Sequence, residues 1–186
     1  MSSEMRASSK AAARELASVD SAAGRVVSEL LPLVLAELPA LLDAVAGPVS
    51  RLEPTVGAAL REARAEALSA AEAAVGLVIA ETEARLRDLP SDPDGALAQR
   101  MRLLARQVGR ARRLRGEPLW PLFPAYRRGA LLGWRRIATL ARRTELPPAV
   151  LVRSREAVFG LVEDLTTATV DGYIHEREAA AQPRRR

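Results

Sequence analysis

The stretch Leu103–Leu140, LLARQVGRARRLRGEPLWPLFPAYRRGALLGWRRIATL, decides the fold of this 186-residue chain. Two amphipathic patterns meet within it at Gly116-Glu117-Pro118. Glycine favours the C-terminal cap of a helix, and proline cannot continue one. The stretch therefore predicts a helix, a tight turn and a second helix. Both tryptophans of the chain, Trp120 and Trp134, lie inside it.

The composition predicts that the rest of the chain is helical as well. Hydrophobic residues make up 48% of the sequence, much of it alanine and leucine, and aromatic residues only 3%. Such a chain lacks the β-branched and aromatic runs that are typical of strands. Its length suits one domain with a sizeable core. We expect an all-α fold of five or so helices.

The side chains that most catalytic and metal sites require are scarce. The absence of cysteine excludes disulfides, cysteine-ligated zinc and thiol nucleophiles. His175 is the single histidine, which disfavours a histidine-based metal site or a Ser/His relay. Glu163 and Asp164 are adjacent, so on a helix they point in different directions. We therefore predict no enzyme activity, no metal and no cofactor.

The first helix is expected to run from Asp20 or Ser21 to about Val45 and to end at Gly47-Pro48. The apolar run Val26–Ala46 has the length of a membrane span, but acidic residues interrupt it and two prolines would kink it. We interpret it as a buried or groove-packed helix with no membrane span. No secretory signal is visible before it, so we expect a cytoplasmic protein.

Two further helices flank a clear loop at residues 90–95. One is expected from Pro54-Thr55 to Leu89, with a break near Ala70–Gly76 where glycine weakens it. The other is expected from Ala96 to about Leu114. On this third helix one apolar stripe is predicted to be buried: Leu97, Met101, Leu104, Val108 and Ala111.

The last two helices begin beside prolines. The fourth starts at Pro121 or Leu122, and the fifth runs from Ala149, after Leu146-Pro147-Pro148, to about Ala181. A single helical domain is thus expected over residues 19–181, with 1–18 a disordered lead-in and 182–186 a basic tail. The buried face of the fourth helix comprises Leu122, Tyr126, Ala130, Trp134, Ile137 and Leu140 or Ala141.

Positive charge is concentrated in residues 97–143, which hold thirteen arginines and a single acid, Glu117. A basic face of this density can neutralise phosphates. It can equally face solvent or pair with acidic side chains of the same fold. We favour the solvated or internally paired face over a nucleic-acid surface, and acidic partners or ligands are the third interpretation.

The aromatic residues divide into two groups. Tyr126 and Trp134 lie eight residues apart on the apolar stripe, so core packing is favoured over base stacking. Trp120 lies at the turn and is the better candidate for a pocket or an interface. The candidate ligand or partner surface is Trp120, Arg110, Arg113, Arg127 and Arg128. The core motif is Gly116, Pro118, Leu119, Tyr126, Gly129 and Trp134.

A series of short motifs follows Leu104: Gly109-Arg110, Gly116-Glu117-Pro118-Leu119, Ala125-Tyr126-Arg127-Arg128-Gly129-Ala130 and Trp134. Leu146-Pro147-Pro148 and Tyr173-Ile174-His175-Glu176 continue the series. This order resembles the N-terminal regulatory domain of PucR/CdaR-type bacterial transcriptional regulators, which is similar to the N-terminal domain of RsbR-type stress-signalling co-antagonists. The resemblance covers residues 97–180 closely and 26–90 loosely.

The resemblance implies a globin-like helical bundle without haem. It also implies a non-enzymatic regulatory or sensor module that acts by protein–protein interaction or by binding a small effector. In such regulators a DNA-reading helix-turn-helix lies in a later domain that this sequence lacks, so operator reading is not implied. An Arg-rich nucleic-acid-binding helical protein is the alternative function.

The last helix carries apolar residues on two faces, and a helix that is apolar on two sides must bury both. Two-fold dimers are the commonest solution for such surfaces. We therefore expect a homodimer or a regulatory protein partner. The first face holds Leu151, Ser154, Val158, Leu161, Leu165, Thr169 and Tyr173, and the second Val152, Phe159, Val162, Thr166 and Val170.

Overall fold

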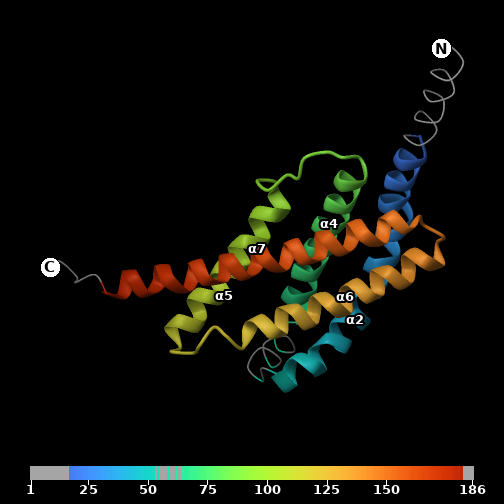
Figure 1. Cartoon of the computed structure of the whole chain (residues 1–186). Coiled ribbons are helices and arrows are strands. Elements are labelled where there is room, and N and C mark those ends of the chain that lie inside the picture. The colour runs from blue at the N-terminus through green and yellow to red at the C-terminus, as the bar shows by residue number, and fades with distance from the viewer. Residues whose placement is uncertain (1–16, 53, 55–57, 59–61, 63, 182–186) are drawn as a thin grey trace, which may run out of the picture.

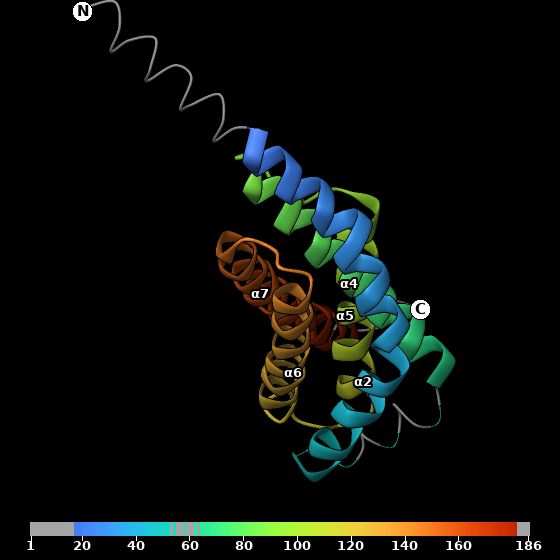
Figure 2. The same cartoon turned by 90° about the vertical axis from the view of Figure 1, so that its right-hand side faces the viewer.

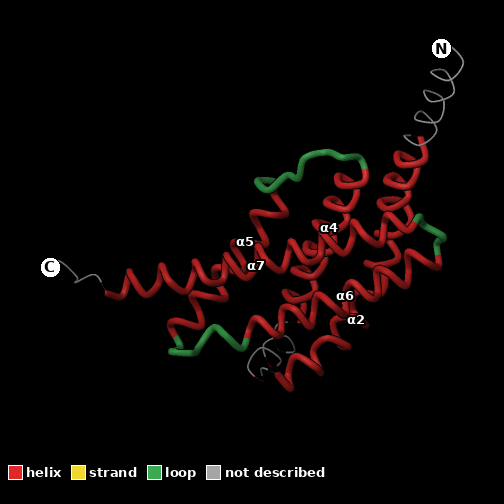
Figure 3. The backbone as a smooth tube through the Cα atoms, in the orientation of Figure 1, coloured by secondary structure: helices red, strands yellow, loops and turns green. Residues whose placement is uncertain are grey.

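The computed structural model describes residues 17–52, 54, 58, 62 and 64–181, and every regular element among them is a helix (Figures 1 and 3). The all-α prediction is therefore confirmed. Of the predicted lead-in at residues 1–18, residues 1–16 lie outside the described residues, as does the basic tail at 182–186, whereas residues 17 and 18 are helical. In chain order the elements are η1 (Val26–Leu30), α2 (Leu31–Leu52), α4 (Arg64–Leu86), α5 (Ala96–Leu114), α6 (Leu122–Arg143) and α7 (Pro148–Ala181).

The first helix is longer than the sequence predicted. Residues 17–20 are already helical, so Asp20 and Ser21 lie inside the helix and do not cap it. At the other end α2 continues through Gly47 and Pro48 to Leu52. A proline costs one intrahelical hydrogen bond, and the neighbouring turns of α2 evidently outweigh that loss. Both predicted boundaries of this helix were wrong.

A wide turn precedes the first proline of this helix. η1 is one π-helical turn, in which Leu31 N–H bonds the carbonyl oxygen of Val26 rather than that of residue 27. Such turns are a known way to bend a helix. Pro32 and Pro39 both follow it inside the continuous helix α2. η1 is therefore a second feature of this helix, besides the two prolines, that can bend it.

The first helix buries only one side. Val26, Leu30, Val34 and Leu38 are at most 3% exposed. The opposite side is largely uncovered, so the interpretation as a buried helix holds for one face. The exposed large apolar side chains on the uncovered side are Val27, Leu33 and Leu35.

The segment Ala17–Gly47 is long and apolar enough to cross a membrane, by length and composition only. Core helices of soluble proteins pass the same test.

The middle helices follow the predicted order with one correction each. α4 runs without a break through Ala70–Gly76. α5 begins at Ala96 and ends at Leu114 as predicted, and Met101 of its predicted stripe is buried, but the rest of the buried stripe differs. Leu97 and Val108 are exposed, because α5 approaches α7 so closely that small side chains fill the contact. The buried residues of α5 are Ala98, Met101, Ala105, Gly109 and Arg112.

The predicted turn between α5 and α6 is confirmed. Gly116 adopts a left-handed φ of 68°, the conformation that favours glycine after a helix. Arg112, only 3% exposed, donates from Nη1 to the carbonyl oxygen of Pro118 (3.1 Å). Its Nε lies 3.3 Å from a carboxylate oxygen of Glu117. This buried arginine fixes the path of the turn.

α7 belongs to two packing arrangements: it pairs closely with α5, and it forms a group of four helices with α2, α4 and α6. α7 crosses α5 closely and also packs on α4 and α6, while α2 packs on α4 and α6. Figure 2 shows α2 running beside α4, with α6 and α7 on the other side of the molecule. The largest apolar core lies where η1, α4, α6 and the start of α7 meet, around Leu30, Ile79, Leu140 and Val150.

Candidate functional site

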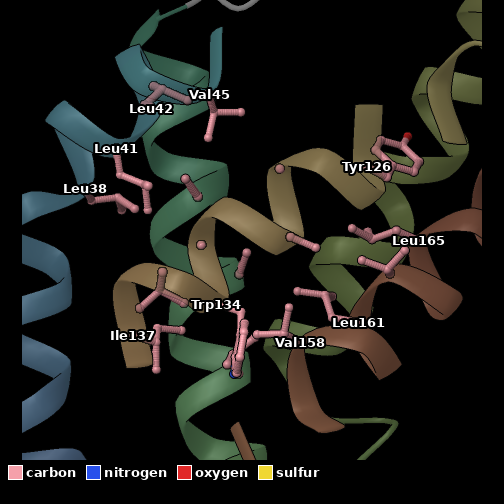
Figure 4. Close-up of a pocket in the computed structure, with 18 of the residues that line it drawn as sticks. Leu38, Leu41, Leu42, Val45, Tyr126, Trp134, Ile137, Val158, Leu161 and Leu165 are labelled. Atoms are coloured by element: carbon pink, nitrogen blue, oxygen red, sulfur yellow. The ribbon is translucent and has the colours of Figure 1, made fainter. Parts of the chain in front are cut away.

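Four helices surround an apolar cavity. α2 and α7 each pack on both α4 and α6, whereas neither diagonal pair of this ring packs closely. The space between the diagonals is a cavity of about 320 Å³, partly open to solvent (Figure 4). Ligand sites between helices of a bundle have this location. The cavity is therefore the candidate functional site.

All four helices contribute to the wall, and nearly all of its surface is carbon. α2 supplies Leu38, Leu41, Leu42 and Val45; α4 supplies Ala71, Ala74, Val75 and Val78; α6 supplies Ala125, Tyr126, Gly129, Ala130, Gly133, Trp134 and Ile137; α7 supplies Val158, Leu161, Val162 and Leu165.

Small residues on α6 create the free volume. Ala125, Gly129 and Gly133 recur every four residues, which places them on one face of the helix. A Cβ atom added to Gly133 would meet no atom within 4 Å, and one added to Gly129 would lie 3.7 Å from Val45 Cγ1. Larger side chains at these positions would occupy the cavity.

Tyr126 contributes a ring to the wall and keeps its hydroxyl engaged elsewhere. Its oxygen lies 3.0 Å from Thr169 Oγ1, and Thr169 already donates its own proton to the carbonyl oxygen of Leu165 (2.7 Å). Tyr126 is therefore the donor of this bond. Burial raises the pKa of Tyr126 above its usual 10.0, so the phenol is uncharged at neutral pH.

Trp134 forms the wall near Val158 and Leu161 (Figure 4). Its indole nitrogen is buried and has no hydrogen-bond partner among the described residues. The Arg155 guanidinium lies 6.0 Å from the centre of the Trp134 ring and 5.7 Å from that of Phe159. Arg155 is thus placed for cation–π contact with both rings.

Two ion pairs tie α2 to the neighbouring walls. Arg136 of α6 donates from Nε to Glu37, and Arg64 of α4 binds both oxygens of Asp43, with Nη2 at 3.0 Å from Oδ2. The bond from Arg136 lowers the pKa of Glu37 below its ordinary 4.5. These side chains are largely solvated, so each pair contributes little to stability. α2 is therefore fastened weakly by charge and mainly by its apolar face.

The predicted core motif is split between two places. Tyr126, Gly129 and Trp134 line the cavity, half-buried rather than fully interior. The other three members, Gly116, Pro118 and Leu119, belong to the turn between α5 and α6.

The predicted ligand or partner surface is separate from the cavity. Trp120 is 70% exposed and does not line it. Arg110 pairs with Glu176 of α7 (2.8 Å), and the Arg113 guanidinium lies 5.6 Å from the ring centre of Tyr173. Arg127 and Arg128 are exposed on α6. Whether any of these residues binds a ligand or a partner stays a prediction.

The cavity itself was not predicted. Three of its α7 residues, Val158, Leu161 and Leu165, lie on the first face predicted for the last helix, but that face was predicted to be filled core. Val162 was predicted on the second face and instead lines the cavity. The available signal was the four-residue recurrence of Ala125, Gly129 and Gly133, together with Ala71 and Ala74 on the facing helix. Among the described residues no cluster of histidine or acidic side chains could hold a metal ion.

Fold and site together define a helical bundle with a ligand-sized apolar cavity and an Arg-rich flank. The family model described as PucR-like N-terminal domain matches residues 72–186, more than half of the chain. The chain therefore belongs to the PucR-like N-terminal domain family, a module of transcriptional regulators. No curated protein and no solved structure matches it significantly. α2 precedes the matched residues, although it supplies one wall of the cavity.

Proposed function

We propose that this chain is a non-enzymatic regulatory module whose input is a small effector bound in the cavity between α2, α4, α6 and α7. The observation that carries the proposal is a ligand-sized apolar cavity inside the ring formed by α2, α4, α6 and α7. Monomeric proteins fill their cores to high density, so an unfilled volume of this size needs an explanation. An effector supplies one.

Effector binding would reach the surface through α2. A ligand that fills the space between α2 and α7 contacts two helices that barely touch one another in the free protein. The ligand therefore increases the population of conformations in which α2 lies close to the ligand, and decreases the population of more open conformations. The outer face of η1 and α2, with Val27, Leu33 and Leu35 exposed, would then present a changed surface to a protein partner.

Thermal unfolding in the presence of small molecules tests the proposal. A ligand that binds only the folded protein stabilises it by about 2.7 kcal/mol at one hundred times its Kd. We expect at least one chemical class to raise Tm saturably, with one molecule bound per chain. A library that spans charged, polar and apolar compounds and never changes Tm would contradict an effector-binding role.

The alternative, nucleic-acid binding by the Arg-rich helices, receives less support. Arg110 is paired with Glu176, Arg136 with Glu37, and Arg112 is buried at the turn. These three side chains are engaged within the fold, which reduces the positive surface that could contact phosphates.

A further inference from the structure

We infer that the effector is an uncharged, hydrocarbon-rich molecule with at most one or two polar atoms. The inference rests on the proposed function and specifies its ligand class. It follows from what the cavity wall lacks, from the size of the cavity and from the arrangement of two aromatic rings along α6.

Among the residues that the structure describes, no ionised side chain lines the cavity. Its two polar wall residues are Tyr126, which is uncharged, and Trp134, whose nitrogen is buried beneath the surface. A charged ligand placed here would lose its hydration without gaining a counter-ion. A polar heterocycle with several donors and acceptors would leave most of them unpaired. Both classes are therefore disfavoured.

The volume limits the ligand to a small molecule. Engineered apolar cavities of about 150 Å³ stay dry and take up benzene. A cavity of about 320 Å³ accommodates a larger molecule, such as a fused pair of rings or a short aliphatic chain.

Two aromatic rings give the cavity its length. Tyr126 and Trp134 lie eight residues apart on α6, a separation of roughly 12 Å along a helix axis. Between them the α6 wall carries only Gly129, Ala130 and Gly133, so no large side chain projects from it. Figure 4 shows the two rings at different ends of the lining, with Leu161 and Leu165 facing α6 from α7. This slot suits an elongated or planar ligand.

Matched probes test the ligand class. 1-Naphthol and 1-naphthoate share one fused ring system, but only the second is ionised at neutral pH. We expect isothermal titration calorimetry to give one 1-naphthol per chain and a Kd at least tenfold lower than that for 1-naphthoate. Equal or tighter binding of 1-naphthoate would overturn the inference.

Cavity-filling variants locate the binding. Gly133→Leu places a side chain in the open volume, and Ala74→Leu does so from the opposite wall on α4. Gly24→Leu is the control, because Gly24 also has open space around its Cβ position but does not line the cavity. At least one filling variant that unfolds cooperatively should bind 1-naphthol tenfold more weakly, while Gly24→Leu binds as wild type does. Unchanged binding in a folded filling variant would place the probe elsewhere and overturn the inference.

The outcomes separate the ligand class from the proposed function. Saturable binding of a charged or polar compound that Gly133→Leu abolishes would overturn the ligand class and leave the effector site standing. If 1-naphthol fails to bind and no compound raises Tm, both the ligand class and the effector role fall.

Discussion

Gly109 of α5 and Gly172 of α7 bring two helix backbones into direct contact. A Cβ atom on Gly109 would overlap the carbonyl oxygen of Thr169, and one on Gly172 would overlap that of Arg106. Close approach of this kind requires glycine on both helices. Because α7 is anchored here, its preceding half is held in position as the wall of the cavity.

Replacing either glycine should therefore destabilise the fold. Gly109→Ala forces the backbones of α5 and α7 apart, and overpacking of this kind costs about 1–3 kcal/mol or more. Gly24→Ala is the control: its Cβ meets nothing within 4 Å, so it should stabilise the helix by about 0.5–1 kcal/mol. Urea unfolding measures both. A Gly109→Ala protein as stable as wild type would mean that the helices cross less closely.

Trp134 and Trp120 should differ sharply in their contribution to stability. Truncating a buried tryptophan to alanine costs about 3–5 kcal/mol, and we expect Trp134→Ala near the lower end, because its ring borders an existing cavity. Trp120 is 70% exposed, so Trp120→Ala should change stability by no more than about 0.5 kcal/mol. Thermal unfolding of the two variants compares them directly. Equal effects would contradict the placement of Trp134 in the wall.

The Glu37–Arg136 pair should make the docking of α2 depend on pH. Because Arg136 lowers the pKa of Glu37 in the folded state, the pair stabilises the fold above about pH 4.5, and this contribution is lost as the pH falls through the lowered pKa. Glu37→Gln should lower Tm slightly at neutral pH, and this effect should shrink as the pH falls below about 4.5. A Tm difference that stays constant between pH 7 and pH 3 would rule out the pair as its cause.

Generic duplex DNA should bind weakly or not at all. We expect fluorescence anisotropy to detect no binding by micromolar protein at 150 mM salt, because much of the Arg-rich region is engaged within the fold. Arg127→Glu with Arg128→Glu is the matched variant, since both side chains are exposed on α6. Tight binding with a steep salt dependence that this variant abolishes would favour the nucleic-acid function instead.

Self-association through the second face of α7 remains a prediction. Val152 and Phe159 on that face are 55% and 40% exposed, whereas Val162 turns towards the cavity. Light scattering at micromolar concentration should give twice the monomer mass, and Phe159→Glu should reduce it to the monomer. A monomeric wild-type protein would mean that this face needs no second copy of the chain.

The sequence determined the features that depend on local interactions. Alanine and leucine content predicted the helices, Gly116 with Pro118 predicted the turn, and Leu146-Pro147-Pro148 predicted the start of α7. Gly47-Pro48 failed as a stop signal, because a proline inside a helix removes one hydrogen bond and packing of the surrounding turns can outweigh that loss. The order of the short motifs also identified the family, because a family is recognised from sequence alone.

Tertiary structure decided which residues are covered and where space remains. The pattern on α5 predicted Leu97 and Val108 as core, yet the contact at Gly109 turns a stripe of smaller residues inward. Val158, Leu161 and Leu165 were predicted on one buried face of α7, but the distance from that face to α2 was not predicted. That distance depends on how each helix packs on α4 and α6, so it is a property of four helices at once, and periodicity within one helix carries no information about it.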